Sequence, residues 1–135
     1  DFNRLNHFKV EEAGEKVAIL ALGDFYQRGE QLSAKIKAEL GFTPTLINPR
    51  FASGIDKELL ESLSERHQMV ITMEDGILSG GFGEKIASFY GSSDMKVKNY
   101  GLDKKFYDRY DPNELLKEVG MTPAQIIADI CNQLK

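Results

Sequence analysis

The sequence predicts one α/β domain with three layers, in which helices cover both faces of a mostly parallel sheet of about five strands. Three observations support this prediction. Short apolar runs alternate with segments whose apolar residues recur at helical spacing. The runs are continuous, as in strands that are buried on both faces. The length of 135 residues, without a repeat or a linker-like stretch, favours a single domain over residues 1–135.

The N-terminal third of the chain is expected to hold two strands and one helix. Residues 7–11 (HFKVE) alternate weakly between apolar and polar, which favours a strand at the edge of the sheet. Residues 16–22 (KVAILAL) form the first continuous apolar run and are expected to be a buried strand. A helix is predicted over residues 30–40, because Gly41 stands at its C′ position and three apolar residues share one face. These three are Leu32, Ile36 and Leu40.

The next unit is expected to be a strand, a helix and a strand. Residues 45–47 are predicted to form a short strand, and residues 68–73 (QMVITM) a third buried one. Between them, Asp56 is a candidate N-cap for a helix over residues 57–66. The apolar residues expected to face the core from this helix are Leu59, Leu60 and Leu63.

A glycine-rich turn over residues 74–83 (EDGILSGGFG) is expected to lead into the following helix. Phe82, Ile86 and Phe89 share one face of that helix. Residues 95–100 (MKVKNY) are expected to form the fourth of the main strands.

Two helices are expected to close the chain. The first covers residues 113–119. The second begins with Thr122 as N-cap and Pro123 at the first helical position. Its inward face is expected to carry Ile127, Ile130, Cys131 and Leu134.

Composition and charge exclude several classes of function. The net charge is −4, with 17 basic residues scattered among 21 acidic ones, so the chain has no positive field to hold nucleic acid. No apolar run approaches the roughly 20 residues of a membrane span. One cysteine and two histidines indicate neither a disulfide nor a zinc site. A reducing, cytoplasmic location is expected, and the start at Asp1, without signal character, suggests a fragment of a longer protein.

The loops at the carboxyl ends of the strands are where a site is expected, because open α/β sheets bind ligands there. These loops cover residues 23–29, 48–55 and 74–83, and the third is the most distinctive. Its glycines allow close approach of the backbone to a neighbour, and the helix that follows has an N-terminus suited to an anion. The phosphate-binding glycine motifs are absent, however, and two acids in the loop would repel a phosphate, which favours a simple tight turn.

Single residues in and near these loops have both chemical and structural interpretations. Glu74 and Asp75 would form a proton-transfer pair if one carboxylate raised the pKa of the other, but sequence neighbours usually point apart, which favours a structural or interfacial role. Arg50 would either clamp a carboxylate or phosphate, or form an interface ion pair. His67 is expected to interact with the C-terminus of a helix. No catalytic, cofactor-binding or metal-binding residue is predicted.

Four segments occur in a distinctive order along the chain. They are residues 17–23 (VAILALG), 48–56 (NPRFASGID), 70–86 (VITMEDGILSGGFGEKI) and 98–106 (KNYGLDKKF). Together they resemble the C-terminal domain of 1-deoxy-D-xylulose-5-phosphate synthase, in the transketolase superfamily, over nearly the whole chain. The order Arg-Phe, helix-opening Asp, Glu and Gly-Gly-x-Gly carries most of the resemblance. The sequence departs from the family's usual pattern at Asp75, where a second glutamate is common, and over residues 101–110.

This resemblance implies a sheet whose N-terminal edge strand is antiparallel. It also implies an intact enzyme that condenses pyruvate with glyceraldehyde 3-phosphate, releases carbon dioxide and makes a precursor of isoprenoids, thiamine and pyridoxal. Thiamine diphosphate and Mg²⁺ would be bound by the two preceding domains. The chain alone is expected to bind no cofactor and to catalyse nothing. Its partners would be the other domains of the same enzyme and the second subunit of a homodimer.

The resemblance places the contacts with these partners in the second and third loops. The interface candidates are Arg50, Asp56, Glu74, Asp75, Gly80, Gly81 and Gly83. Two other interpretations stay open. One is the C-terminal assembly domain of another transketolase or of a 2-oxoacid dehydrogenase, and the other is a stand-alone α/β binding module of the flavodoxin-like or receiver-like kind.

Overall fold

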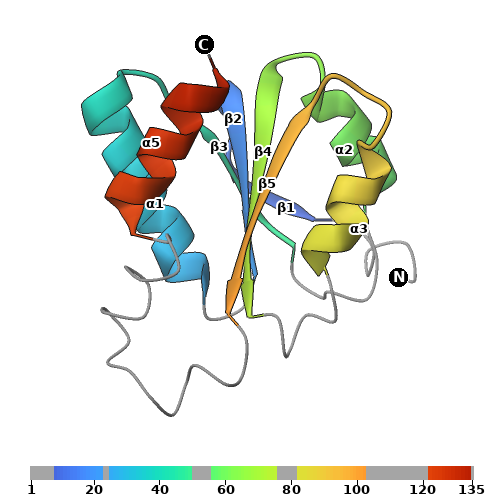
Figure 1. The fold of residues 1–135 in the computed structure, drawn as a ribbon, viewed down its shortest axis with the longest axis horizontal. Coiled ribbons are helices and arrows are strands. Elements are labelled where there is room, and N and C mark those ends of the chain that lie inside the picture. Colours follow the sequence, from blue (N-terminus) through green and yellow to red (C-terminus); the bar gives the residue numbers. More distant parts are fainter. Residues whose placement is uncertain (1–7, 23–24, 50–55, 76–81, 103–121, 135) are drawn as a thin grey trace.

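The structure is a computed structural model that describes residues 8–22, 25–49, 56–75, 82–102 and 122–134. These residues fold into three layers, with a five-stranded sheet between two pairs of helices (Figure 1). The strand order is β1-β3-β2-β4-β5. The predicted α/β/α class is therefore confirmed. No helix within the described ranges is long and apolar enough to span a membrane.

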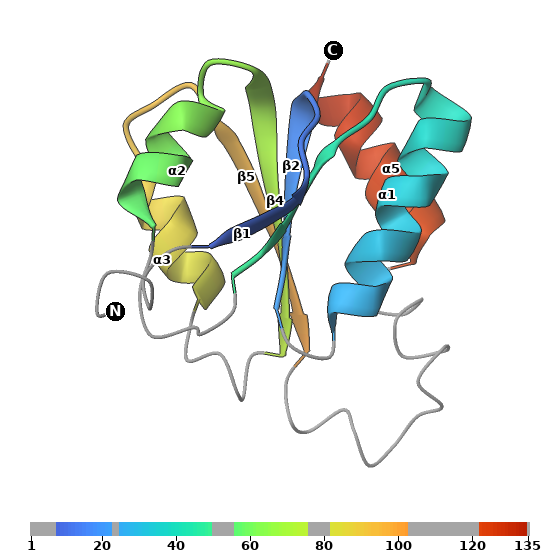
Figure 2. The same ribbon diagram turned by 180° about the vertical axis from the view of Figure 1, so that it is seen from behind.

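The sheet is parallel except at one edge. β2 (Lys16–Ala21) lies at the centre, between β3 (Thr45–Asn48) and β4 (His67–Asp75), and is parallel to both. β5 (Lys96–Leu102) is parallel to β4 and forms the edge nearest the viewer in Figure 1. β1 (Lys9–Glu12) pairs antiparallel with β3 at the other edge, which is turned to the front in Figure 2. The antiparallel N-terminal edge strand is thus confirmed.

Two helices, α1 (Tyr26–Leu40) and α5 (Pro123–Gln133), cover one face of the sheet. Because successive strand residues point to opposite sides, alternate residues of β2 and β4 meet these helices. The core on this side contains Val17, Ile19, Ala21, Met69, Ile71 and Met73 from these two strands, and Leu32, Ile36, Ile126, Ile127 and Ile130 from the helices. A hydrogen bond of 2.6 Å from the Tyr100 hydroxyl of β5 to Asp129 also fixes α5 to the sheet.

The helices α2 (Lys57–Leu63) and α3 (Phe82–Phe89) cover the opposite face. The core on this side contains Ala18, Leu20, Ile47 and Val70 from the sheet, and Leu60, Leu63, Phe82, Ile86 and Tyr90 from the two helices and the residue after α3. The Tyr90 hydroxyl donates a hydrogen bond of 2.6 Å to the carbonyl oxygen of Leu60. This bond joins the end of α3 to the middle of α2.

The structure corrects the predicted start of α1. The helix begins at Tyr26 and not at residue 30, so Gly29 lies inside it. A Cβ atom on Gly29 would lie 2.6 Å from the Cβ of Ala21. The glycine therefore allows α1 to pack closely on β2 and does not interrupt the helix. The predicted end is confirmed, because Gly41 follows Leu40 in the left-handed conformation, with φ of 78°.

The last helix begins as predicted, but one of its side chains does not face the core. Thr122 caps α5, and its side chain and that of Gln125 form a capping box, which the sequence analysis missed. The prediction that Cys131 is buried is wrong, because the residue is exposed. Ile126 is buried instead, so the buried face of α5 is turned away from Cys131. The helix predicted over residues 113–119 lies outside the described residues.

Candidate functional site

The carboxyl ends of the parallel strands lie at one edge of the sheet, at the bottom of Figure 1. Open α/β sheets usually present their functional surface at this edge. Three of the predicted interface residues are described there, namely Asp56, Glu74 and Gly83. The others lie outside the description and are Arg50, Gly80, Gly81 and the side chain of Asp75.

Asp56 is a buried carboxylate with both oxygens in use. It precedes α2, and its Oδ1 accepts a hydrogen bond of 3.2 Å from the Leu59 N–H, which confirms the predicted N-cap. Its Oδ2 accepts a hydrogen bond of 3.0 Å from the Phe8 N–H. The residue is only 7% exposed. Asp56 therefore ties Phe8, the residue before β1, to the start of α2, a role that its local sequence does not indicate.

Glu74 is a buried carboxylate that uses one oxygen. It is the penultimate residue of β4 and is 8% exposed. Its Oε1 accepts a hydrogen bond of 3.1 Å from the N–H of Gly83, in the first turn of α3. Its Oε2 is buried and has no hydrogen-bond partner among the residues that the structure describes. Because the carboxylate already occupies the N-terminus of α3, a phosphate bound there would meet a like charge.

Gly83 packs against the sheet. A Cβ atom at this position would lie 2.8 Å from the Cγ of Asn99 and 3.0 Å from the Oγ1 of Thr72. These two side chains are joined by a hydrogen bond of 2.6 Å from the Thr72 hydroxyl to the Asn99 Oδ1. Glycine at position 83 therefore allows the start of α3 to approach β4 and β5. Along this face of β4, Val70, Thr72 and Glu74 follow in order, so the strand becomes more polar toward its carboxyl end.

An aromatic contact joins the surroundings of Asp56 and Glu74. The ring of Phe8 lies edge-on to the ring of Phe82, with the two centroids 5.9 Å apart. Phe82 directly precedes Gly83 in the chain. We refer to Phe8, Asp56, Glu74, Phe82 and Gly83 as the carboxylate corner. Its two acids and its glycine were predicted from the sequence as candidate residues, whereas the part played by Phe8, which lies 48 residues from Asp56, was not predicted.

The carboxylate corner can accept hydrogen bonds, but it contains neither a histidine nor a cysteine. Among the residues that the structure describes, no group of three or more His, Cys, Asp or Glu side chains is placed to hold a metal ion. The disfavoured alternative of a proton-transfer pair between Glu74 and Asp75 is not tested, since the side chain of Asp75 is outside the description. The described residues at this edge therefore offer carboxylate acceptors and packed aromatic rings.

A separate hydrogen-bond network closes the opposite, amino end of the sheet. The Nδ1 of His67 donates a hydrogen bond of 2.9 Å to the carbonyl oxygen of Leu63, which confirms the predicted contact with a helix C-terminus. Its Nε2 lies 2.6 Å from the Oγ1 of Thr45, and this oxygen also accepts a hydrogen bond of 2.9 Å from the Gly14 N–H. Burial lowers the pKa of His67, so the ring is neutral at pH 7 and its Nε2 accepts from the Thr45 hydroxyl.

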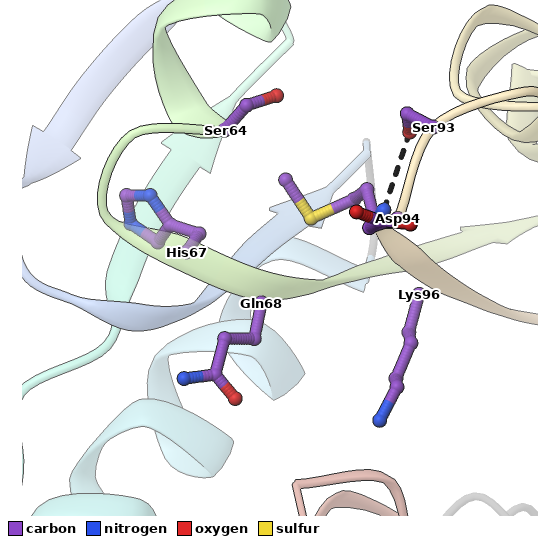
Figure 3. Close-up of a pocket in the computed structure, with 7 residues that line it drawn as sticks. Ser64, His67, Gln68, Ser93, Asp94 and Lys96 are labelled. Atoms are coloured by element: carbon purple, nitrogen blue, oxygen red, sulfur yellow. Dashed lines mark hydrogen bonds between the residues drawn. The ribbon is translucent and has the colours of Figure 1, made fainter.

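An open pocket of about 420 Å³ borders the amino end of β4 and β5 (Figure 3). Its lining residues are Ser64, His67, Gln68, Ser93, Asp94, Met95 and Lys96. Both ring nitrogens of His67 are engaged inside the protein, and Lys96 donates to the carbonyl oxygen of Gln133. In Figure 3 the side chains of Gln68 and Lys96 extend away from His67. Because these polar groups do not converge, the pocket does not fit one specific ligand.

Comparison with known proteins identifies relatives of this chain. Residues 6–126 match the family described as the C-terminal domain of transketolase. The chain is 32% identical over 132 residues to a 1-deoxy-D-xylulose-5-phosphate synthase from Shouchella clausii (strain KSM-K16), which covers 96% of this chain and 21% of that protein. It is 38% identical over 115 residues to a synthase of the same name from Clostridium perfringens (strain 13 / Type A), over 84% of this chain and 18% of that protein. The chain thus spans about a fifth of the length of these curated relatives.

Solved structures share the fold. One described as "Split gene transketolase, inactive beta4 tetramer" has a TM-score of 0.76 and 25% identity, over 95% of this chain and 42% of that chain. A 2-oxoglutarate:ferredoxin oxidoreductase from Magnetococcus marinus has a TM-score of 0.59 and 14% identity, over 96% of this chain and 20% of that chain. The second likeness concerns the fold alone.

Proposed function

The chain belongs to the transketolase C-terminal domain family, and on this basis we propose that it is the C-terminal domain of a thiamine-diphosphate-dependent 1-deoxy-D-xylulose-5-phosphate synthase. The intact enzyme would join pyruvate and glyceraldehyde 3-phosphate with loss of carbon dioxide. The observation that carries this proposal is the match to synthases over most of the chain but only about a fifth of their length. The domain itself would serve assembly, through contacts with the rest of the enzyme and with a second subunit.

The described residues do not fit the cofactor of such an enzyme. The start of α3, a natural place for a diphosphate, is taken by the carboxylate of Glu74. No cluster of metal-ligating side chains accompanies it in the described ranges. We therefore assign thiamine diphosphate and Mg²⁺ to the rest of the enzyme and derive no catalytic step from this chain.

The carboxyl edge of the sheet is the docking surface in this proposal. Its candidate residues are Arg50, Asp56, Glu74, Asp75, Gly80, Gly81 and Gly83. Asp56 and Gly83 also have contacts within the domain, so they would act by holding the surface in shape. Glu74 is different, because one of its oxygens has no partner in the described part of the domain.

A second candidate function is the C-terminal assembly domain of another transketolase-type enzyme. The likeness to the split gene transketolase favours it, because the description of that structure is an inactive tetramer of one kind of chain. In this case the present chain would also form an inactive oligomer by itself. Sedimentation velocity on the purified chain would then report a tetramer.

Reconstitution tests both candidates. The thiamine-diphosphate-binding part of the enzyme would be produced separately and mixed with this chain, Mg²⁺ and the cofactor. We expect neither part alone, and only the mixture, to convert pyruvate and glyceraldehyde 3-phosphate to 1-deoxy-D-xylulose 5-phosphate. A mixture that instead transfers a two-carbon unit from a ketose phosphate would support the second candidate. Product formation by this chain alone would contradict both.

A further inference from the structure

The buried oxygen of Glu74 that lacks a partner is not explained by the fold. The Oε1 atom alone makes the contact with the N–H of Gly83. A glutamine could make the same contact without placing a negative charge in a buried position. The Oε2 atom is shielded from water and receives no hydrogen bond from any described residue, which costs free energy in the isolated domain.

Asp56 shows that this fold can satisfy a buried carboxylate at the same edge. It is 7% exposed, against 8% for Glu74, so the two carboxylates are buried to the same degree. Both oxygens of Asp56 accept backbone hydrogen bonds, one from Leu59 and one from Phe8. The difference between the two acids therefore lies in the supply of donors and not in the depth of burial.

No described residue supplies a donor to this oxygen, so we look for one in the docking partner, and charge indicates its kind. The chain carries a net charge of −4, which favours association with a cationic surface. The relatives extend over about five times the length of this chain, so a large part of the enzyme is available to supply that surface. A lysine or arginine side chain forms stronger hydrogen bonds to a carboxylate than a neutral donor does.

We infer that the Oε2 of Glu74 accepts a charge-assisted hydrogen bond from one lysine or arginine side chain of the polypeptide that docks on the carboxyl edge. The inference rests on the proposed function, because that function supplies the docking partner. Glu74 is the penultimate residue of its strand, so its carboxylate lies near the carboxyl end of the sheet, and docking would have to displace the atoms that shield its Oε2 in the free domain. The Gly83 N–H fixes the carboxylate before the partner arrives, which lowers the entropy lost on binding.

The test compares two glutamates that are close in sequence and differ in burial. Glu74→Gln keeps the acceptor for Gly83 and replaces the free oxygen by an amide NH₂ group. Glu84→Gln removes the same charge from an exposed residue next to Gly83 and is the matched control. Titration calorimetry would measure the affinity of each variant for the thiamine-diphosphate-binding part, and thermal unfolding would measure the stability of each variant alone.

We expect Glu74→Gln to melt at or above the temperature of the unmodified chain and to bind its partner at least about tenfold more weakly. Glu84→Gln should bind within about twofold of the unmodified chain. Equal binding by Glu74→Gln and the unmodified chain would overturn the inference while leaving the proposed function intact. Equal weakening by both variants would also overturn it, since the effect would then come from overall charge. If the unmodified chain does not bind at all, the proposed function fails, and the inference fails with it.

Discussion

The two ends of the sheet satisfy their buried polar groups differently. At the amino end, Gly14, Thr45, His67 and Leu63 form a continuous chain of hydrogen bonds in which each side-chain group has a partner. At the carboxyl end, Glu74 has one buried oxygen to which no residue of the described ranges donates a hydrogen bond. Both ends belong to the same strand, β4, so the difference does not arise from separate parts of the fold.

This difference separates residues that serve folding from those available for function. A complete network stabilises the domain by itself, because every group that loses water gains a partner. An incomplete one costs stability, and binding to another molecule that completes it would remove this cost. We therefore expect substitutions at the amino end to act on stability alone, and those at Glu74 to act on assembly.

The largest expected effect is at Gly14, before β2. A Cβ atom here would lie 2.1 Å from the carbonyl oxygen of Thr43 and 2.6 Å from the backbone of Pro44, and backbone cannot move aside cheaply. Gly14→Ala should lower the free energy of unfolding by about 3 kcal/mol, measured by chemical denaturation. Gly91→Ala is the control, since its nearest neighbour would be 3.3 Å away, and should cost less than about 1 kcal/mol. Equal losses would contradict the close packing at Gly14.

The next effect is at Gly83, where the obstructing atoms belong to side chains that can shift. Gly83→Ala should cost about 1–2 kcal/mol because the new methyl group meets Asn99 and Thr72. In a background that carries Asn99→Ala, the same substitution should cost less, because the nearest obstruction is gone. Additive losses in this double-mutant cycle would show that Gly83 is required for another reason.

Asp56 and Glu74 should respond oppositely to loss of charge. Asp56→Asn leaves one oxygen to serve two donors, the N–H groups of Phe8 and Leu59, so it should cost about 1–2 kcal/mol. Glu74→Gln should leave the stability of the isolated chain unchanged or raised, since it removes a buried charge without losing the contact to Gly83. Thermal unfolding of both variants at pH 7 measures this contrast. Similar losses for the two would mean that Glu74 is satisfied within the domain.

The smallest effect concerns pH. Burial depresses the pKa of His67 in the folded chain below the ordinary value of 6.5, so the unfolded chain binds the proton more readily. The stability supplied by neutral His67 is therefore complete above pH 6.5 and is lost as the pH falls through the folded-state pKa. The denaturation midpoint should decrease as the pH is lowered from 7.5 to 5. The slope of the unfolding free energy against pH should correspond to the uptake of less than one proton on unfolding. His67→Gln should reduce this slope, and an unchanged slope would assign the pH dependence to other groups.

Much of the fold was predictable because the signals are local. The continuous apolar runs correctly predicted the central strands, and Gly41 correctly predicted the end of α1. The start of α1 was wrong because Gly29 has a low helix propensity, and its close contact with Ala21 is visible only in the fold. The capping box of Thr122 with Gln125 was not predicted, although it follows a known spacing and could have been recognised in the sequence.

The candidate site was less predictable, because its contacts join distant segments. Asp56 was correctly predicted as an N-cap, but its second bond, to Phe8, depends on where the residue before β1 lies relative to α2. Glu74 was singled out as an interface candidate, yet its unsatisfied oxygen depends on which donors the fold brings near it. Cys131 was wrongly predicted to face the core. The buried face of α5 includes Ile126 and is turned away from Cys131.

The most direct measurement of the central claim is amide hydrogen exchange on this chain, with and without the thiamine-diphosphate-binding part. If the carboxyl edge docks, the amides of Phe8, Leu59 and Gly83 should exchange more slowly in the mixture, because they are the donors of the carboxylate corner. The amides of Gly14 and Lys96, at the amino end, should be unchanged. Slower exchange confined to the amino end would place the docking surface at that end of the sheet and would contradict docking at the carboxyl edge.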